Sequence, residues 1–596
     1  MKVVVSTLNA KYIHSSLALA YLEEACHSDN WELETFEFTI NDKLDHIMTS
    51  LYRSQPDVLC FSTYIWNIEE TLSLCQDFKK ISPQCLIILG GPEVSYDAAT
   101  VLQEHPCIDY IVRGEGEITL CQLLGQILEE KDIDEVKGIT YRYQGQVMEN
   151  PDRPLITELG SLPSPFRRDF TPYKDRVIYY ESSRGCPFNC SYCLSSTARG
   201  VRFFPMERVK EELQYLLKYE LREIKLVDRT FNCNEKRARE IMQFIAEQGS
   251  STRVHLEICA DLLSDEFIAF LGKLPADVFN FEIGIQSTCP EALQAVHRVS
   301  HWETLRQNIL QLRSFNNIHL HLDLIAGLPY ESYTSFQDSF NNVFSLQPHM
   351  LQLGFLKLLK GSEIYRQHYE HGYRFQTRPP YQVLANNYIS YDEIIKLQQI
   401  EEVLNRYYNK NIVPGTIAYA INKVYHGNAF AFFEDFALYW EENELFGRGH
   451  RRVKEYDILL NFLNFRWPDR KKEWNELIKY DFLYHNLPHP FPQGIERLEP
   501  DGAGDLLNTR LQDQAFLSSL PGDWADSRYN IRKHLHLEYF IFDPISLTFL
   551  EQPLPLIFVY HPVKKKAVGV INEAGDRLIA DLYNNNQTNY KIFCQS

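Results

Sequence analysis

Three cysteines stand close together in the segment Ser182-Ser183-Arg184-Gly185-Cys186-Pro187-Phe188-Asn189-Cys190-Ser191-Tyr192-Cys193. Thiolates at this spacing can bind three irons of a 4Fe-4S cluster, and the lack of a fourth cysteine nearby leaves one iron open. An open iron can chelate the amino and carboxylate groups of S-adenosylmethionine (SAM). A structural zinc site is the alternative, but it normally needs four ligands, and no partner CxxC pair occurs elsewhere in the chain.

The overall composition limits what kind of protein surrounds these cysteines. A chain of 596 residues predicts several domains, and 44% hydrophobic with 23% charged residues is typical of a folded protein. The net charge of -19 opposes binding to phosphate backbones, so we expect no duplex DNA partner. No apolar run approaches the roughly 20 residues that span a bilayer, and the apolar start is too short for a secretory signal. We therefore expect a cytoplasmic protein without a membrane segment.

The first 130 or so residues alternate short β-rich runs with helical patterns, which predicts a doubly wound, Rossmann-like parallel sheet. The expected strands are 3–5, 33–36, 58–61, 86–89 and 110–112, with crossover helices at 16–26, 68–78 and 118–128. Ligands of such sheets bind at the carboxyl ends of the strands. The loops that follow strands three, four and five should therefore form a site, and they span 62–67, 90–93 and 113–117.

A second series of strands and helices follows a predicted hairpin at 138–148 and a proline-rich linker at 151–165. Its strands are expected at 177–180, 224–227, 254–257, 279–283, 320–324 and 351–355. Six such units predict a partial (β/α)6 TIM-like barrel, whose chemistry gathers at the carboxyl ends of its strands. Beyond about residue 370 we expect a mixed, mainly helical domain. The predicted division is 1–135, 136–170, 171–370 and 371–596.

The cysteine segment resembles the CxxxCxxC motif of the radical SAM superfamily. The resemblance implies that Cys186, Cys190 and Cys193 bind the cluster, that Tyr192 lies near the adenine, and that SAM yields a 5'-deoxyadenosyl radical. It also implies SAM contacts at the strand ends. These implied contacts are Asp228, Glu282, Gln286, Ser287, Asp323 and Ile325. Glu257 joins them because an inward acid at the carboxyl end of a barrel strand is more often functional than structural. Cys233, Cys259 and Cys289 are isolated, and we expect them to be structural.

The N-terminal region resembles the cobalamin-binding domain that precedes the barrel in one branch of this superfamily. The resemblance rests on FSTYIWN, ILGGPE and RGEGE, and small residues there would let a corrin approach the backbone. The implied cobalamin contacts are Ser62, Thr63, Tyr64, Trp66, Gly90, Gly91, Pro92, Glu93, Gly114, Glu115 and Gly116. The region after 370 resembles an uncharacterised domain that often follows these modules, and we expect it to shape the substrate site.

The axial ligand of the cobalt is one point where the chain departs from a familiar pattern. Many cobalamin proteins supply a histidine from D-x-H-x-x-G, but here the stretch after the first strand reads Leu8-Asn9-Ala10-Lys11-Tyr12-Ile13-His14-Ser15. His14 could still reach the metal. We expect instead a cobalt without a protein histidine, with Tyr64 or Trp66 beneath the corrin.

These resemblances together imply a cobalamin-dependent radical SAM methyltransferase acting on an unactivated carbon. One SAM would methylate cob(I)alamin, and a second would give the radical that abstracts a substrate hydrogen. Cyclisation, rearrangement or oxidation, a tRNA methylthiotransferase, and a non-catalytic cobalamin or cluster sensor are the alternatives. A methylthiotransferase needs three further cysteines, whereas those before residue 130 mostly fall within helices or strands. The expected partners are an unknown substrate and an electron donor such as flavodoxin or ferredoxin.

Overall fold

The computed structural model describes residues 1–198, 200–500, 503–514, 516, 531–544, 546–560 and 567–571. The contacts between residues divide the chain into two units. The first is Met1–Ser339 with Leu353–Ile394, and the second is Phe340–Gln352 with Ile395–Ser596. Among the described residues, no helix combines the length and the apolar character needed to cross a bilayer.

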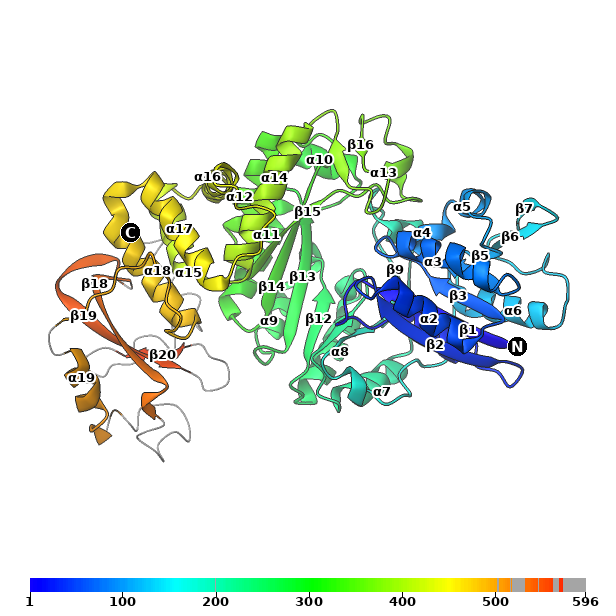
Figure 1. Ribbon diagram of the computed structural model, residues 1–596, viewed down its shortest axis with the longest axis horizontal. Coiled ribbons are helices and arrows are strands. Elements are labelled where there is room, and N and C mark those ends of the chain that lie inside the picture. Colours follow the sequence, from blue (N-terminus) through cyan, green and yellow to red (C-terminus); the bar gives the residue numbers. More distant parts are fainter. Residues whose placement is uncertain are drawn as a thin grey trace. The chain divides into compact units, whose positions relative to one another are not determined.

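The first unit begins with a seven-stranded sheet in the order β2-β1-β3-β4-β5-β6-β7, in blue and cyan in Figure 1. Strands β1 to β5 pair in parallel, and β6 and β7 form an antiparallel hairpin at one edge. The strands are β1 (Lys2–Asn9), β2 (Glu32–Thr39), β3 (Val58–Ser62), β4 (Leu86–Gly90), β5 (Tyr110–Val112), β6 (Ile139–Tyr143) and β7 (Gln146–Glu149). The central strands are continuous apolar runs because both faces of the sheet are covered.

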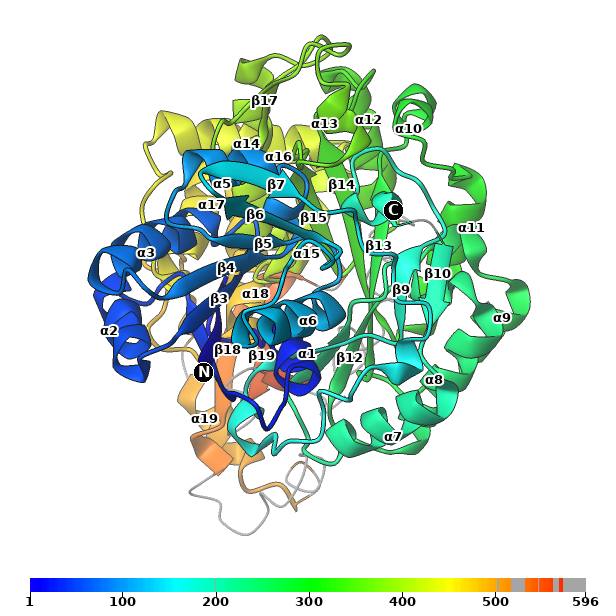
Figure 2. The ribbon, with the colours of Figure 1, turned by 90° about the vertical axis from the view of Figure 1, so that its right-hand side faces the viewer.

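Helices cover both faces of this sheet (Figure 2). Val3 and Val5 pack in one apolar cluster with α1 (Leu17–Ala25) and α6 (Gly116–Leu128). The opposite cluster contains Val4 and the remaining helices, α2 (Leu44–Ser54), α3 (Ile68–Ile81), α4 (Pro92–Ser95) and α5 (Ala98–Glu104). The predicted doubly wound N-terminal domain is confirmed.

The second sheet has the order β15-β14-β13-β12-β11-β8, and the pairs from β8 to β14 are parallel. Its strands are β8 (Val177–Tyr180), β11 (Glu223–Leu226), β12 (Arg253–Glu257), β13 (Phe279–Gln286), β14 (His319–Ala326) and β15 (Met350–Phe355). Burial alternates along β13 and β14, so that apolar side chains face the covering helices and polar ones face the barrel interior. The predicted partial barrel is confirmed.

The helices of the barrel lie on the outer side of its strands (Figure 2). They are α7 (Met206–Leu217), α8 (Glu235–Glu247), α9 (Asp265–Leu271), α10 (Pro290–Ala295), α11 (Trp302–Phe315) and α12 (Tyr333–Phe344). A hairpin of β9 (Ser183–Cys186) and β10 (Gly200–Phe203) follows β8 and was not predicted. After β15 come α13 (Glu363–Arg366), β16 (Arg374–Phe375) and β17 (Val383–Ala385). Single 3-10 turns are η1 (Leu159–Ser161), η2 (Thr171–Tyr173), η3 (Leu194–Thr197), η4 (Phe231–Cys233) and η5 (Ala260–Leu262).

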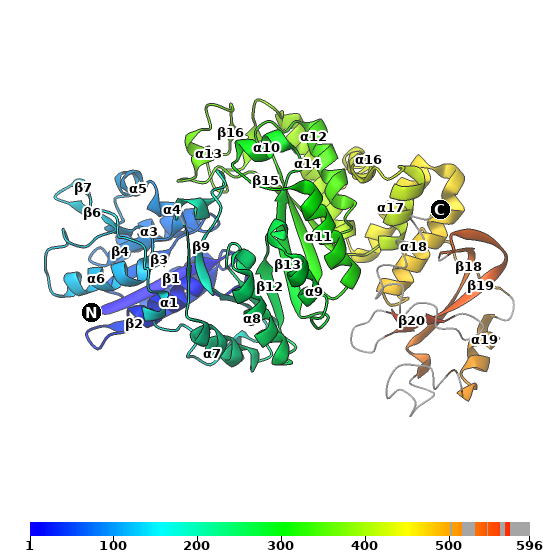
Figure 3. The same ribbon diagram turned by 180° about the vertical axis from the view of Figure 1, so that it is seen from behind.

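The C-terminal region is mixed and mainly helical, as predicted. Its helices are α14 (Tyr391–Leu404), α15 (Pro414–Tyr419), α16 (Ala429–Glu442), α17 (Arg452–Arg466), α18 (Lys471–His485) and α19 (Ala503–Arg510), with the π-helical turns η6 (Asn405–Asn409) and η7 (Ala420–Val424) and the 3-10 turn η8 (Pro468–Arg470). An antiparallel sheet of β18 (Leu535–Asp543), β19 (Thr548–Tyr560) and β20 (Ala567–Ile571) packs beside α18 (Figure 3). The buried Lys479 and Glu476 of α18 bind the Tyr539 carbonyl and the Ile541 amide of β18, at 2.7 and 2.9 Å.

Candidate active site

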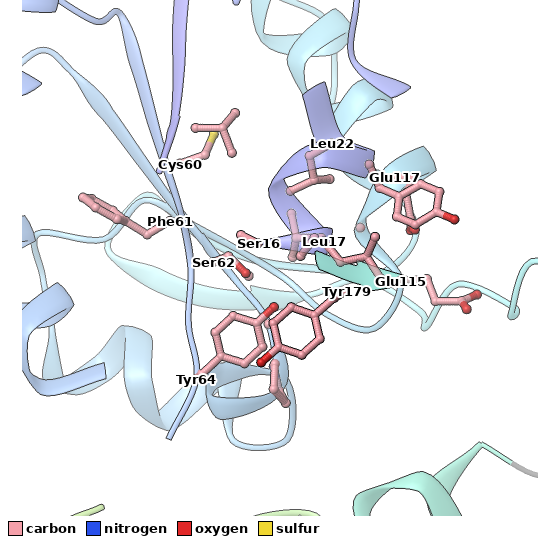
Figure 4. A pocket seen from close by; sticks show the side chains of 18 of the residues that line it. Ser16, Leu17, Leu22, Cys60, Phe61, Ser62, Tyr64, Glu115, Glu117 and Tyr179 are labelled. Atoms are coloured by element: carbon pink, nitrogen blue, oxygen red, sulfur yellow. The ribbon is translucent and has the colours of Figure 1, made fainter. Parts of the chain in front are cut away.

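A cavity of about 780 Å³ lies between the carboxyl ends of the N-terminal strands and the barrel strands β8 and β11. Nine of the residues expected to contact cobalamin line it: Ser62, Tyr64, Trp66, Gly90, Gly91, Pro92, Gly114, Glu115 and Gly116. Figure 4 shows Tyr64 and Tyr179, together with Leu17 and Leu22 of α1, among the side chains that line this cavity. The cavity is thus built from both the N-terminal domain and the barrel.

Gly91 packs closely against the Thr63 backbone at the end of β4. Its φ of +106° is a left-handed value, and a Cβ there would lie 2.3 Å from the Thr63 carbonyl oxygen. Thr63 is fully buried, and both its amide and its hydroxyl donate to the Gly90 carbonyl at 2.7 Å. Thr63 therefore joins two strand ends instead of lining the cavity, and only glycine fits beside it.

Tyr64 and Trp66 form a stacked aromatic pair in the cavity wall, which we call the Tyr64 and Trp66 platform. Their ring centroids lie 4.5 Å apart with only 4° between the planes. The Trp66 indole donates to the Leu8 carbonyl at 3.1 Å, which fixes the ring although 41% of the residue is exposed. A fixed, mostly apolar plane of this kind suits a large planar ring system.

His14 also lines the cavity, and its imidazole has a protein partner. The Nδ1 atom lies 2.9 Å from the Tyr179 hydroxyl. Burial and the nearby Lys11 and Lys225 charges hold the pKa of His14 below its usual range. The structure therefore places a neutral histidine against the first barrel strand.

Two of the acids expected at the cobalamin site have partners elsewhere. Glu93 does not line the cavity, because its carboxylate accepts from the Tyr381 hydroxyl and lies 3.9 Å from Lys360. Glu115 lines the cavity and forms ion pairs with Arg184 at 3.2 Å and Arg202 at 2.9 Å. Burial raises the pKa of Glu115, but Arg202, the Ile156 amide and Arg184 outweigh it and lower the pKa.

Arg184 is the centre of a largely buried ionic group, which we call the Arg184 cluster. Its guanidinium contacts Glu115, Glu117 at 2.6 Å and Glu181 at 2.7 Å, and its side chain is only 13% exposed. Glu115 and Glu117 belong to the N-terminal domain, whereas Arg184 lies in β9, two residues before Cys186. The ion pairs of the Arg184 cluster therefore connect the N-terminal wall of the larger cavity to its barrel wall.

A second cavity, of about 190 Å³, lies at the mouth of the barrel and contains all three cysteines of the triad. The SAM contacts expected from sequence that line it are Tyr192, Glu257, Glu282, Gln286 and Asp323. Cys186 Sγ lies 3.5 Å from the Thr230 hydroxyl, and Arg298 approaches Cys190 Sγ at 3.9 Å. In a 4Fe-4S cube each thiolate binds a different iron, so the sulfurs need not converge on one point.

Asp228, Ser287 and Ile325 do not line this second cavity. Asp228 is 1% exposed and accepts from the Ser182 amide and hydroxyl and from the Ser183 hydroxyl, at 2.9, 2.7 and 2.5 Å. Ser287 is buried and donates to Glu331 at 2.5 Å. Asp228 and Ser287 hold loops around the cavity in place.

The acids that do line the second cavity differ in charge state. Burial would raise the pKa of Glu282, but His255 at 2.7 Å and Lys225 at 2.9 Å lower it well below its usual range. Burial raises the pKa of Asp323 even though His321 lies 3.0 Å away. Burial also raises the pKa of Glu257 to about 7, since only the more distant Arg229 and Lys225 oppose it. Glu257 is therefore the acid of this cavity that exchanges a proton near neutral pH.

The lining residues that were not predicted as site residues include Arg229, Thr230, Cys259 and Arg298. Arg298 stands 108 residues from the cysteine it contacts, and its position in a short loop after α10 carries no motif signal. Cys259 was expected to be structural, yet it lines the cavity beside the triad. Arg229 lines both cavities and is the only described residue that they share.

The two cavities fit two different cofactors. Three thiols beside the half-buried guanidinium of Arg298 suit an anionic iron-sulfur cluster, and the adjoining acids and Gln286 suit the polar ends of SAM. The glycine-lined larger cavity with its aromatic platform suits a corrin.

Comparison with protein families agrees with both assignments. Residues 3–124 match the B12 binding domain, and residues 180–343 match the radical SAM superfamily. The chain therefore combines a B12 binding domain with a radical SAM domain. These two matches support cobalamin, a 4Fe-4S cluster and SAM as its cofactors. Residues 369–555 match a family described as a protein of unknown function, DUF4080.

Known proteins with similar sequences or folds cover part of this chain. An uncharacterized methyltransferase of Pyrococcus horikoshii is 27% identical over 53% of this chain and 70% of its own length. The cobalamin-dependent radical SAM methyltransferase TokK of Streptomyces tokunonensis is 26% identical over 50% of this chain, which spans about half of TokK (46%). The structure of the cobalamin-dependent SAM radical enzyme OxsB has a similar fold, with a TM-score of 0.57 and 14% identity over 80% of this chain and 78% of that one.

Proposed function

We propose that this cobalamin-binding radical SAM enzyme is a methyltransferase that methylates an unactivated carbon of its substrate. The observation that carries the proposal is the wall that the two cavities share at Arg229, because such a transfer needs one carbon within reach of both cofactors. Two of the similar proteins are named methyltransferases, which supports the same reaction.

In this proposal Cys186, Cys190 and Cys193 hold the cluster, and the acids with Tyr192 and Gln286 surround SAM. When bound, the cluster supplies the electron that cleaves SAM, and cobalamin carries the methyl group. The guanidinium of Arg298 lies 3.9 Å from Cys190 Sγ, where its positive charge offsets the negative charge beside that cysteine. Asp228 fixes Ser182 and Ser183 immediately before the cysteine loop, and Ser287 fixes the loop after Gln286. These residues act by holding loops and charges in place.

We also propose that the cobalt has no histidine ligand from the protein. The Tyr64 and Trp66 platform occupies the loop after β3, and His14 is engaged by Tyr179 at 2.9 Å. A cobalt without a strong lower donor favours low coordination and an easy return to the reduced state. That property suits repeated methyl transfer.

Product stoichiometry tests the proposed function. Reconstituted enzyme with SAM, a strong reductant and a small-molecule extract should release 5'-deoxyadenosine and S-adenosylhomocysteine in equal amounts, because each methylation consumes two SAM molecules. Trideuteromethyl SAM should transfer its label to a product. Release of 5'-deoxyadenosine without S-adenosylhomocysteine would instead indicate a cyclisation, rearrangement or oxidation, and no SAM cleavage at all would indicate a sensor.

A methylthiotransferase is not favoured by the positions of the other cysteines. Cys75 and Cys85 are buried in one apolar cluster of the N-terminal sheet, and Cys26 and Cys60 are buried in the other. A second cluster would need three open thiols at the carboxyl edge of that sheet, and among the described cysteines before residue 130 only Cys60 lines the larger cavity there.

The remaining expectations stay proposals. We propose flavodoxin or ferredoxin as the electron donor, and a cytoplasmic location, where the cysteines would stay reduced. We also propose a division into domains at 1–135, 171–370 and 371–596, with a hairpin and linker at 136–170. In this division the last domain shapes the access of substrate.

A further inference from the structure

Arg229 occupies a special position between the two cavities. It lines both of them, lies three residues after the end of β11, and is exposed. Its neighbours in sequence are fixed: Asp228 is 1% and Thr230 is 6% exposed, and each contacts the cysteine segment. The backbone of Arg229 is therefore fixed on both sides, whereas its side chain is exposed.

The charges around the two cavities are otherwise paired, in the part of the chain that the structure describes. The pairs are Glu115, Glu117 and Glu181 with Arg184, Glu282 with Lys225 and His255, and Asp323 with His321. Arg298 donates to the Gly284 carbonyl and contacts Cys190. Two lining charges remain without an ion pair or side-chain hydrogen bond among the described residues, namely Arg229 and Glu257.

We infer that Arg229 binds a carboxylate of the substrate, so that the methyl acceptor is a carboxylic acid. The inference rests on the proposed function, because a substrate carbon reached from both cavities must pass beside Arg229. A guanidinium presents a planar set of donors that matches a carboxylate in a bidentate pair. A carboxylate would add one negative charge beside Arg229, whereas a phosphate would add a second one. The second charge is unfavourable because the positive charge of Arg229 already acts on Glu257.

A binding experiment on the loaded enzyme tests this inference without turnover. The probes are 4-fluorobenzoate and 4-fluorobenzamide, which share a ring and differ in charge, followed by fluorine NMR in a buffer free of carboxylate and phosphate. We expect the parent enzyme to bind the benzoate about tenfold more tightly, and Arg229→Gln to lose that preference. Arg229→Lys should restore part of it. Arg222→Gln is the matched control, because Arg222 is exposed and lies outside both cavities, just before β11.

Three results of this binding experiment would overturn the inference. Equal binding of the two probes to the parent, or an unchanged benzoate preference in Arg229→Gln, would remove Arg229 from anion binding. A tenfold loss of SAM or hydroxocobalamin affinity in Arg229→Gln, with benzoate binding intact, would assign Arg229 to a cofactor.

A turnover experiment separates this inference from the proposed function. A metabolite extract is divided by anion exchange and incubated with the enzyme and trideuteromethyl SAM. Label should appear in the retained fraction, survive phosphatase treatment and disappear when carboxylates are converted to methylamides. Label in the unretained fraction would show that the methyl acceptor carries no carboxylate, although methyl transfer occurs. Label that is lost only on phosphatase treatment would show that the acceptor carries a phosphate instead. If no fraction is labelled although SAM is cleaved, methyl transfer itself fails, and the fluorine probes still decide whether Arg229 binds carboxylates.

Discussion

Glu331 offers a sharp test of how burial controls the loops around the SAM cavity. It is 1% exposed, and its Oε1 accepts from the Ser287 and Ser339 hydroxyls at 2.5 and 2.9 Å. Its Oε2 is buried without a hydrogen-bond partner among the described residues. Burial accordingly raises the pKa of Glu331 from 4.5 to about 7. The folded protein prefers the neutral acid at this position.

This preference makes stability depend on pH in a predictable direction. Between pH 4.5 and 7 the folded state holds a proton at Glu331 that the unfolded state has lost, so the free energy of unfolding falls as the pH rises. A shift of this size corresponds to about 3 kcal/mol, fully lost above pH 7. Glu331→Gln keeps the Oε1 acceptor and removes the titration.

The assay is urea unfolding of parent and variant at a series of pH values from about 4.5 to 8. The difference in unfolding free energy between Glu331→Gln and the parent should change by about 3 kcal/mol in favour of the variant across this range. Glu266→Gln, at an exposed carboxylate of α9, is the control and should follow the parent. An identical pH dependence for Glu331→Gln and the parent would refute the reasoning.

Three further predictions concern the cofactor sites. Changing Cys186, Cys190 or Cys193 to alanine should lower the iron content and abolish SAM cleavage, and parent-like cleavage in the triple variant would end the radical SAM assignment. The electron paramagnetic resonance spectrum of the cob(II)alamin form should lack the triplet splitting that a nitrogen ligand causes, and splitting that is lost in His14→Ala would identify His14 as the ligand. Gly91→Ala should lower cobalamin uptake and the melting temperature, because its Cβ would meet the Thr63 carbonyl at 2.3 Å, whereas Gly125→Ala, in open space within α6, should preserve both.

Much of the fold could be predicted because parallel strands leave clear signals in sequence. Strands β3 and β4 are uninterrupted apolar runs, since both faces of the sheet are covered, and the expected bounds differ from the observed ones by about a residue. The helix α2 was not among the crossover helices named from the sequence. The β9–β10 hairpin was missed because its strands have only four residues each.

The site was predicted where residue type alone determines the role, as for the cysteines and the strand-end glycines. The roles of the acidic residues were harder to predict from the sequence. Glu93 and Asp228 stand at strand ends as expected, but Glu93 meets Tyr381, 288 residues away, and Asp228 meets Ser182 and Ser183. Whether a strand-end acid faces a ligand or a neighbouring element depends on such distant partners, which a single sequence does not reveal.

The Arg184 cluster limits how this protein can be rebuilt from parts. Arg184 belongs to the barrel, and two of its three carboxylate partners, Glu115 and Glu117, belong to the N-terminal domain. Removing the partner of a buried charge costs about 3–5 kcal/mol. A chimera that exchanges the cobalamin domain with that of a relative must therefore carry both glutamates along, or replace Arg184 as well. Any recombined enzyme therefore has to keep these three residues together.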